Sequence, residues 1–200
     1  WIKKCNDGKH PNMLAVLLDY KNKIFTTEVV QTHQTDKMEK DLGLKERTLA
    51  EWKKIFKFVV DDDGIRITGY KGEDVVVVIP DTIDGKPVKH IGEKAFKNCD
   101  MITTTLIPDS VTDIGKSAFW LCKNLKEIQI PDSVVSIGNC AFLGCGALES
   151  ITIPDSVSEI GQDAFNGCDN LQEVVLPESI VQIGRGAFCM CQGLKSITIP

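Results

Sequence analysis

The chain has 200 residues, of which 42% are hydrophobic, and its formal net charge is −5. This length and composition suffice for a sizeable core. The longest aliphatic runs, such as Val75 to Ile79, are far shorter than the roughly 20 residues of a membrane-spanning helix, so no membrane span is predicted. No basic and apolar leader opens these residues, and a start at Trp1 leaves open that a leader was removed.

The charge is unevenly divided along the chain. Residues 1–58 hold 12 basic and 8 acidic side chains, whereas residues 59–200 hold 11 basic and 20 acidic ones. Binding to nucleic acid requires a basic face opposite the phosphates. The sequence therefore predicts no nucleic-acid partner.

Residues 1–58 have helical character. One helix is predicted over 12–20 and a second over about 27–41, from good helix formers with apolar residues on one face. A third begins after Thr48, which with Glu51 has the spacing of a capping box. This third helix is expected to bury Leu49, Trp52, Ile55 and Phe56. We interpret residues 1–58 as a helical N-terminal segment that forms a cap or a small docking domain.

A hairpin is predicted next. Alternating strands at 58–60 and 65–68 flank Asp61-Asp62-Asp63-Gly64, and Asp-Gly is a strong turn signal. The three aspartates do not match a calcium loop of the EF-hand type, which needs carboxylates at alternate positions and a distal Glu. We interpret them as a solvated acidic turn.

The rest of the chain is repetitive, with a fixed step of 23 residues. A period in this range is typical of a solenoid, in which each unit buries its apolar face only against its neighbours. The step is read from the prolines Pro108, Pro131, Pro154, Pro177 and Pro200. Two further columns keep the same spacing: Phe96, Phe119, Phe142, Phe165 and Phe188, and Cys99, Cys122, Cys145, Cys168 and Cys191.

Each coil is predicted to hold two short strands and a corner. In the coil before Pro131, Leu125, Ile128 and Ile130 point inward and Glu127 and Gln129 outward. Pro131 ends this strand because it lacks an N–H.

A second short strand returns through Val134 and Ile137. Gly138 is expected to supply a backbone conformation closed to other residues, and a tight helical or 3₁₀ corner follows around Phe142 and Cys145.

Two coils depart from this pattern. The step from Pro80 to Pro108 is 28, and the extra residues lie at 83–88, where Asp-Gly and Pro predict a loop on one face. Thr105 stands where later coils have Ile128, Ile151 and Val174, so a locally weaker core is expected there.

One sequence pattern occurs almost intact at 130–148 and again at 153–171: Ile-Pro-Asp-Ser-Val-x-x-Ile-Gly-x-x-Ala-Phe-x-x-Cys-x-x-Leu. This pattern resembles the repeat of the BspA-type leucine-rich repeat family of bacterial proteins. The resemblance covers about residues 59–200. It implies an α+β chain: a β-rich, right-handed leucine-rich-repeat solenoid of 23-residue coils, preceded by the small helical segment. It also implies bacterial surface adhesion or host-protein binding.

The residues offer little chemistry. Five of the eight cysteines fall in the repeat register and are interpreted as free core thiols, because parallel Cβ vectors suit disulfides poorly. Cys189 and Cys191 form a Cys-x-Cys without the four convergent ligands of a zinc site. His10, His33 and His90 have no catalytic partner at a recognisable spacing. No metal, cofactor or enzymatic activity is predicted.

Two surfaces are candidate protein-binding sites. One is the outward face of the strands, with Glu127, Gln129, Thr152, Glu173 and Val175. The other is an exposed cluster of Trp120, Leu121 and Leu143 beside the Phe corner, unless the helical segment covers it.

The sequence favours a non-catalytic protein-interaction module, at the cell surface or secreted if a leader was removed. The alternative is an intracellular scaffold with a helical docking segment, which free thiols and the missing leader favour. The final coil is also expected to present an open edge that supports self-association.

Overall fold

The structure is a computed structural model, and it describes residues 47–199. A compact unit begins at Thr48 and continues through all the repeats. Its elements are α4 (Leu49–Ile55), β1 (Phe56–Val60), β2 (Ile65–Tyr70), β3 (Val76–Val78), β4 (Thr82–Ile83), β5 (Lys86–Ile91), β6 (Thr104–Leu106), β7 (Asp113–Ile114), β8 (Glu127–Gln129), β9 (Ser136–Ile137), β10 (Glu159–Ile160), β11 (Glu173–Val175), β12 (Gln182–Ile183) and β13 (Ser196–Thr198).

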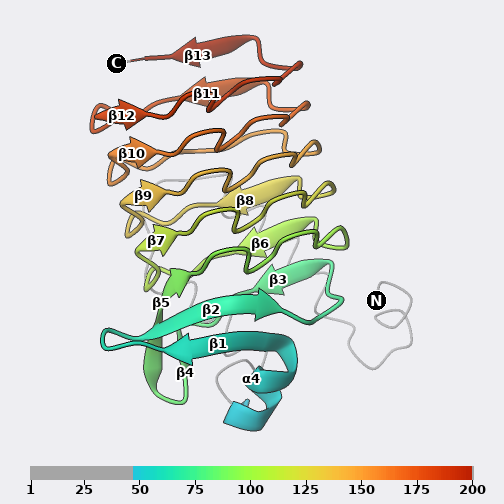
Figure 1. Ribbon diagram of the computed structural model, residues 1–200, viewed down its shortest axis with the longest axis vertical. Helices are drawn as coiled ribbons and strands as arrows, with labels where there is room; N and C mark the ends of the chain where they lie inside the picture. The colour runs from blue at the N-terminus through green and yellow to red at the C-terminus, as the bar shows by residue number, and fades with distance from the viewer. Residues whose placement is uncertain (1–46, 200) are drawn as a thin grey trace, which may run out of the picture. The chain divides into compact units, whose positions relative to one another are not determined.

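These elements form a β-solenoid of about six turns with one short helix at its N-terminal side (Figure 1). One ladder of strands runs β1-β2-β5-β7-β9-β10-β12, and a second consists of β3-β6-β8 and β11-β13. The strands pair in parallel from coil to coil, except in the hairpins β1–β2 and β4–β5. The predicted solenoid is thereby confirmed.

The first layer is built by the predicted third helix and hairpin. Thr48 and Glu51 form the expected capping box, since the Glu51 N–H donates to Thr48 Oγ1 at 3.3 Å and the Thr48 N–H donates to Glu51 Oε2 at 2.7 Å. Trp52 and Phe56 are buried as predicted, but Phe56 is the first residue of β1, and Leu49 and Ile55 are only half-buried.

Helix α4 thus belongs to the same compact unit as the repeats. The helices predicted over 12–20 and 27–41 lie outside the described residues. The division of the chain into domains after residue 58 therefore stays a prediction.

The core contains a column of phenylalanines. The ring centroids of Phe96, Phe119, Phe142, Phe165 and Phe188 follow one another at 4.9, 5.3, 5.2 and 5.3 Å, with successive planes inclined by 3–6°. In the first four of these coils, the backbone N–H of the Phe donates to the carbonyl oxygen of the alanine in the following coil, as from Phe142 to Ala164 at 2.7 Å. A third side of the solenoid is therefore also bonded from coil to coil.

The corner at the phenylalanines is not helical. It consists of successive turns, in which the Cys145 N–H donates to the Phe142 carbonyl at 3.1 Å and the Leu148 N–H to the Cys145 carbonyl at 3.0 Å. Left-handed residues interrupt these turns, among them Cys140 with φ of 56° and Gly144 with φ of 75°. A left-handed residue cannot continue a right-handed helix, which is why the prediction of a helical or 3₁₀ corner was wrong.

The backbone conformation predicted for Gly138 was also wrong. Gly138 is not among the residues with positive φ. A Cβ at Gly138 would instead lie 2.7 Å from the backbone carbon of Gly115 and the backbone nitrogen of Lys116 in the preceding coil. Glycine is needed here because two backbones approach too closely for a side chain, and not because of its dihedral freedom.

The insertion at 83–88 is a hairpin and not an irregular loop. Ile83 in β4 pairs with Lys86 in β5, and the two residues between them, Asp84 and Gly85, have φ of 53° and 70°. Two positive φ values are typical of the type I′ turn that connects twisted antiparallel strands. The extra residues extend β5, and the parallel ladder continues from β2 to β7 with one register shift, between Ile65 and Arg66 of β2.

The second ladder has a gap in the coil of Ser150 to Thr152, where no strand is formed. The Glu149 N–H donates to Lys126 O, and the Gln172 N–H to Glu149 O, both at 3.3 Å, compared with 2.9 Å for the equivalent bond from Lys126 to Thr103. Ile151 and Ile153 nevertheless stay buried at 6% and 4% exposure. The side-chain pattern of the repeat is thus kept where the strand is lost.

Candidate functional site

The outward strand positions lie in register on one face of the solenoid. Thr104 pairs with Glu127 and Leu106 with Gln129 across β6 and β8, while Glu173 pairs with Ser196 and Val175 with Thr198 across β11 and β13. Gln129, Thr152, Glu173 and Val175 are exposed, and Glu127 is half-buried. Five predicted residues are therefore presented on one side, although Thr152 stands in the coil without a strand.

The second predicted surface, Trp120 with Leu121 and Leu143, is less exposed than expected. The structure brings these residues together, because the Leu121 N–H donates to the Leu143 carbonyl at 2.8 Å. All three side chains are half-buried. The ammonium of Lys97, one coil earlier, lies 4.2 Å from the centroid of the Trp120 ring, a cation–π contact that covers one face of the indole. The Trp–Leu cluster is therefore half-buried and not fully exposed, and its role as a binding surface stays a prediction.

Apolar side chains are exposed at the last described coil. Val181, Met190 and Ile199 have exposed fractions of 85%, 70% and 70%. Within the described residues, β12 pairs only with β10 and β13 only with β11.

None of the described cysteines forms a disulfide. Of the five thiols in the repeat register, Cys99 and Cys191 are half-buried, and Cys122, Cys145 and Cys168 are part of the core. Each of the last three donates its S–H to the carbonyl of a phenylalanine 26 residues earlier, as from Cys145 to Phe119 O at 3.1 Å. Burial raises the pKa of Cys122 to about 12 and that of Cys145 well above its ordinary value. These thiols are inert packing groups.

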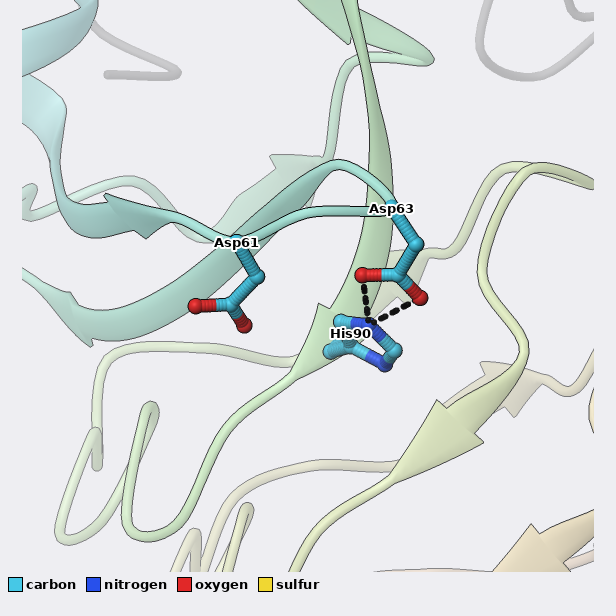
Figure 2. Close-up of side chains that lie close together, drawn as sticks. All are labelled: Asp61, Asp63 and His90. Atoms are coloured by element: carbon cyan, nitrogen blue, oxygen red, sulfur yellow. Dashed lines mark hydrogen bonds and ion pairs between the residues drawn. The ribbon is translucent and has the colours of Figure 1, made fainter.

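The β1–β2 hairpin turn creates a polar corner that the sequence analysis missed (Figure 2). His90, on β5, is only 8% exposed. Its Nε2 lies 3.0 and 3.2 Å from the two carboxylate oxygens of Asp63, and its Nδ1 is hydrogen-bonded to Asp113 on β7. The hydrogen bond from His90 lowers the pKa of the Asp63 carboxyl. The interpretation of this turn as simply solvated was therefore incomplete.

An arginine completes the corner. Arg66 Nε donates to Asp61 Oδ2 at 2.8 Å, and Arg66 Nη1 lies 3.8 Å from Asp113 Oδ1. In the strand ladder Arg66 pairs with His90, and His90 with Asp113. His90 and Asp113 are 23 residues apart, so the repeat register itself contained the signal that they are neighbours.

The turn is held tightly over β5. A Cβ at Gly64 would lie 2.6 Å from the Pro87 carbonyl oxygen and 2.7 Å from Lys89 Cγ. The Asp61 N–H also donates to the Gly64 carbonyl at 2.8 Å. This close packing holds the backbone of the turn next to Asp63 against β5.

Stacked coils with parallel strand ladders, a column of aromatic rings and buried thiols define a leucine-rich-repeat solenoid. The model of the BspA type leucine rich repeat region matches residues 89–200 with six copies. The chain therefore belongs to the BspA-type leucine-rich repeat family.

Solved structures agree with this family. The chain is 42% identical to a leucine-rich repeat protein from T. pallidum, with a TM-score of 0.72, over 74% of this chain and 70% of that one. It is 38% identical to a leucine-rich repeat protein from Bacteroides ovatus, with a TM-score of 0.66, over 72% and 39% of the two chains.

A third similar structure is a leucine rich cell surface protein from Faecalibacterium prausnitzii, 26% identical with a TM-score of 0.50, over 71% of this chain and 52% of that one. The chain thus spans about half or less of the length of the Bacteroides and Faecalibacterium proteins. A search of curated proteins found no match. No helix within residues 47–199 is long and apolar enough to cross a membrane.

Proposed function

We propose that this chain is a non-catalytic protein-binding module and that it acts in adhesion at a bacterial cell surface or after secretion. The family is consistent with a protein-interaction module. A surface location is supported by the likeness to the cell surface protein of Faecalibacterium prausnitzii.

The observation that carries the proposal is the strand face described above. Gln129, Glu173 and Val175 extend from a ladder whose alternate residues, such as Ile128 and Val174, are buried in the core. Val175 is 56% exposed and pairs with the polar Thr198 of the next coil. A rigid strand face loses little conformational entropy on binding, and a mixed polar and apolar surface suits a protein partner.

The same face gives a test with a matched control. A photo-crosslinking residue at Gln129 should form adducts with a partner on intact cells, whereas one at Glu159, exposed on β10 of the other ladder, should not. Once the partner is isolated, Glu173→Lys should weaken binding at least tenfold, and Glu159→Lys, which makes the same charge change, less than twofold. Equal effects of the two substitutions would refute binding by this face.

The Trp120 surface remains a second candidate for the same function. Lys97 covers one face of its ring, and within the described residues the Trp120 Nε1–H has no hydrogen-bond partner. Because this N–H is itself buried, a partner would contact the accessible part of the half-buried ring. Trp120→Ala should then weaken partner binding, and unchanged binding would exclude the ring from the contact.

An intracellular scaffold is the alternative function, and the unpaired state of the described cysteines supports it. Labelling of intact cells with a thiol reagent that does not cross membranes separates the two locations. Cys189 is exposed and should react on intact cells if the protein is outside, and only after lysis if it is inside.

Self-association through the last coil is part of the proposal. Its support is the exposure of Val181, Met190 and Ile199, and within the described residues β13 pairs on one side only, with β11. Light scattering over a concentration series should show an oligomer, and the Val181→Lys substitution should lower the fraction of oligomer at each concentration. A monomer at every concentration would contradict this.

A further inference from the structure

The polar corner at the hairpin turn poses a problem of charge. The Nδ1 of His90 is hydrogen-bonded to the Asp113 carboxylate, which only accepts hydrogen bonds when ionised, so this nitrogen carries a proton. The other nitrogen, Nε2, faces both oxygens of Asp63 at 3.0 and 3.2 Å. A nitrogen lone pair and a carboxylate repel each other. A positive species, either a proton or a metal ion, is therefore needed between Nε2 and Asp63.

The surrounding charges favour more than one positive charge at this position. Asp61, Asp63 and Asp113 together carry three negative charges, and Arg66 carries one positive charge. With a neutral imidazole the corner has a charge of −2. With a second proton on His90 the net charge of the corner is −1, whereas a divalent cation bound to the neutral imidazole brings the net charge to zero.

The ligand atoms lie close enough together for one ion. One carboxylate oxygen each from Asp61 and Asp63, and one ring nitrogen of His90, all lie within 4.8 Å of one another. Figure 2 shows both aspartates at the end of the hairpin, with His90 on the strand below and Asp63 directed at its ring. Arg66 Nε donates a hydrogen bond to Oδ2 of the same Asp61 carboxylate at 2.8 Å.

We propose that Asp61, Asp63 and His90 form a binding site for a divalent transition-metal ion. Zn²⁺ fits this ligand set best, since it accepts imidazole nitrogen and carboxylate oxygen in tetrahedral sites with three protein ligands and a water. Ca²⁺ and Mg²⁺ prefer oxygen alone.

Asp113 has the position of a residue that supports the site without binding the ion. A carboxylate on the far nitrogen of a metal-binding histidine fixes its tautomer and raises its basicity. The ion would tie the hairpin turn to β5 and, through Asp113, to β7. It would thereby clamp the first layer of the solenoid to the repeats.

The test is a calorimetric titration of the full chain with Zn²⁺ alone, supported by the visible spectrum of the Co²⁺ form. Asp63→Asn and His90→Gln should each lower the affinity for one molar equivalent of Zn²⁺ at least tenfold. Asp113→Asn should lower the affinity for the same equivalent. Asp62→Asn, in the same turn but outside the ligand set, should change affinity less than twofold. Because thiols and the other histidines also bind metal ions, the site is defined by the difference between variants.

A further measurement makes the result decisive. Zn²⁺ should also raise the melting temperature of the wild type and of Asp62→Asn but not that of Asp63→Asn. Asp63 is 61% exposed, so its variant is expected to fold even if His90→Gln does not. Equal affinity of Asp63→Asn and wild type, or no binding at millimolar Zn²⁺, would overturn the proposal and leave a proton alone between the two side chains.

Discussion

The ring of Phe142 lies parallel to the ring of Phe119, with centroids 5.3 Å apart and planes inclined by 5°, although 23 residues separate the two in the chain. The same relationship connects Phe142 to Phe165 on its other side, at 5.2 Å. Each interior ring is thus packed on both faces by the rings of neighbouring coils. A coil cannot bury its own phenylalanine, and stability is shared along the array.

The first prediction concerns this column. Phe142→Ala should lower the free energy of unfolding by roughly 3–5 kcal/mol, because it removes a fully buried ring and leaves a cavity between two others. Urea unfolding followed by circular dichroism measures the loss. Phe188→Ala is the matched control, since Phe188 is only half-buried and has a described ring neighbour on one side. An equal loss for both variants would contradict the role of two-sided stacking.

Thr105 gives a prediction of the opposite sign. Its side chain is fully buried, and its hydroxyl has no hydrogen-bond partner within the described part of the chain. Thr105→Val keeps the shape and removes the unsatisfied polar group, so we expect a gain of about 1–2 kcal/mol in the free energy of unfolding. Thr152→Val, at an exposed position, should change it by less than about 0.5 kcal/mol. A destabilised Thr105→Val would mean that the hydroxyl has a partner.

The close approach of the coils is tested at Gly138. Gly138→Ala places a Cβ at 2.7 Å from two backbone atoms of the preceding coil, which cannot move without disturbing the ladder. We expect a loss of about 1–3 kcal/mol. Gly146→Ala is the control, because its Cβ would meet only a side-chain oxygen of Asp169 at 3.9 Å. Chemical denaturation of both variants gives the comparison, and a neutral Gly138→Ala would show that the coils can separate slightly.

The buried thiols predict a loss of stability at alkaline pH. Burial raises the pKa of Cys122 from 9.0 to about 12 and raises that of Cys145 as well. Above pH 9 the thiols of the unfolded chain lose their protons while the folded ones keep them. The free energy of unfolding should then fall by about 1.4 kcal/mol per pH unit for each such thiol.

Denaturation curves between pH 8 and pH 10.5 measure this slope. Cys145→Ala should reduce the slope, while Cys189→Ala, which removes an exposed cysteine, should leave it unchanged. The same slope in wild type and Cys145→Ala would exclude the buried thiol as a cause.

The solenoid was predictable because its determinants are local and repeated. Pro131, Phe142 and Cys145 recur at a constant step, and a repeated pattern places every copy once one copy is understood. The outward positions of Gln129 and Val175 followed in the same way from strand alternation.

The errors concern contacts between coils, which no single coil displays. Glycine is required at position 138 because the backbone of the preceding coil lies too close for a Cβ. The sequence pattern of a single repeat does not give the distance between two coils. The corner of His90 depends on a hairpin that folds back over β5, outside the repeat. The strand lost at Ser150 to Thr152 has buried residues like its neighbours, and the sequence offers no signal for its longer hydrogen bonds.

The β4–β5 hairpin has a practical consequence for engineering. Its turn residues Asp84 and Gly85 are exposed, and no atom lies within 4 Å of a Cβ built on Gly85. A coil of this protein therefore already accommodates extra residues while the ladders on both sides stay intact. A foreign epitope grafted between Asp84 and Gly85 would be displayed from a rigid scaffold, with its two ends anchored by paired strands.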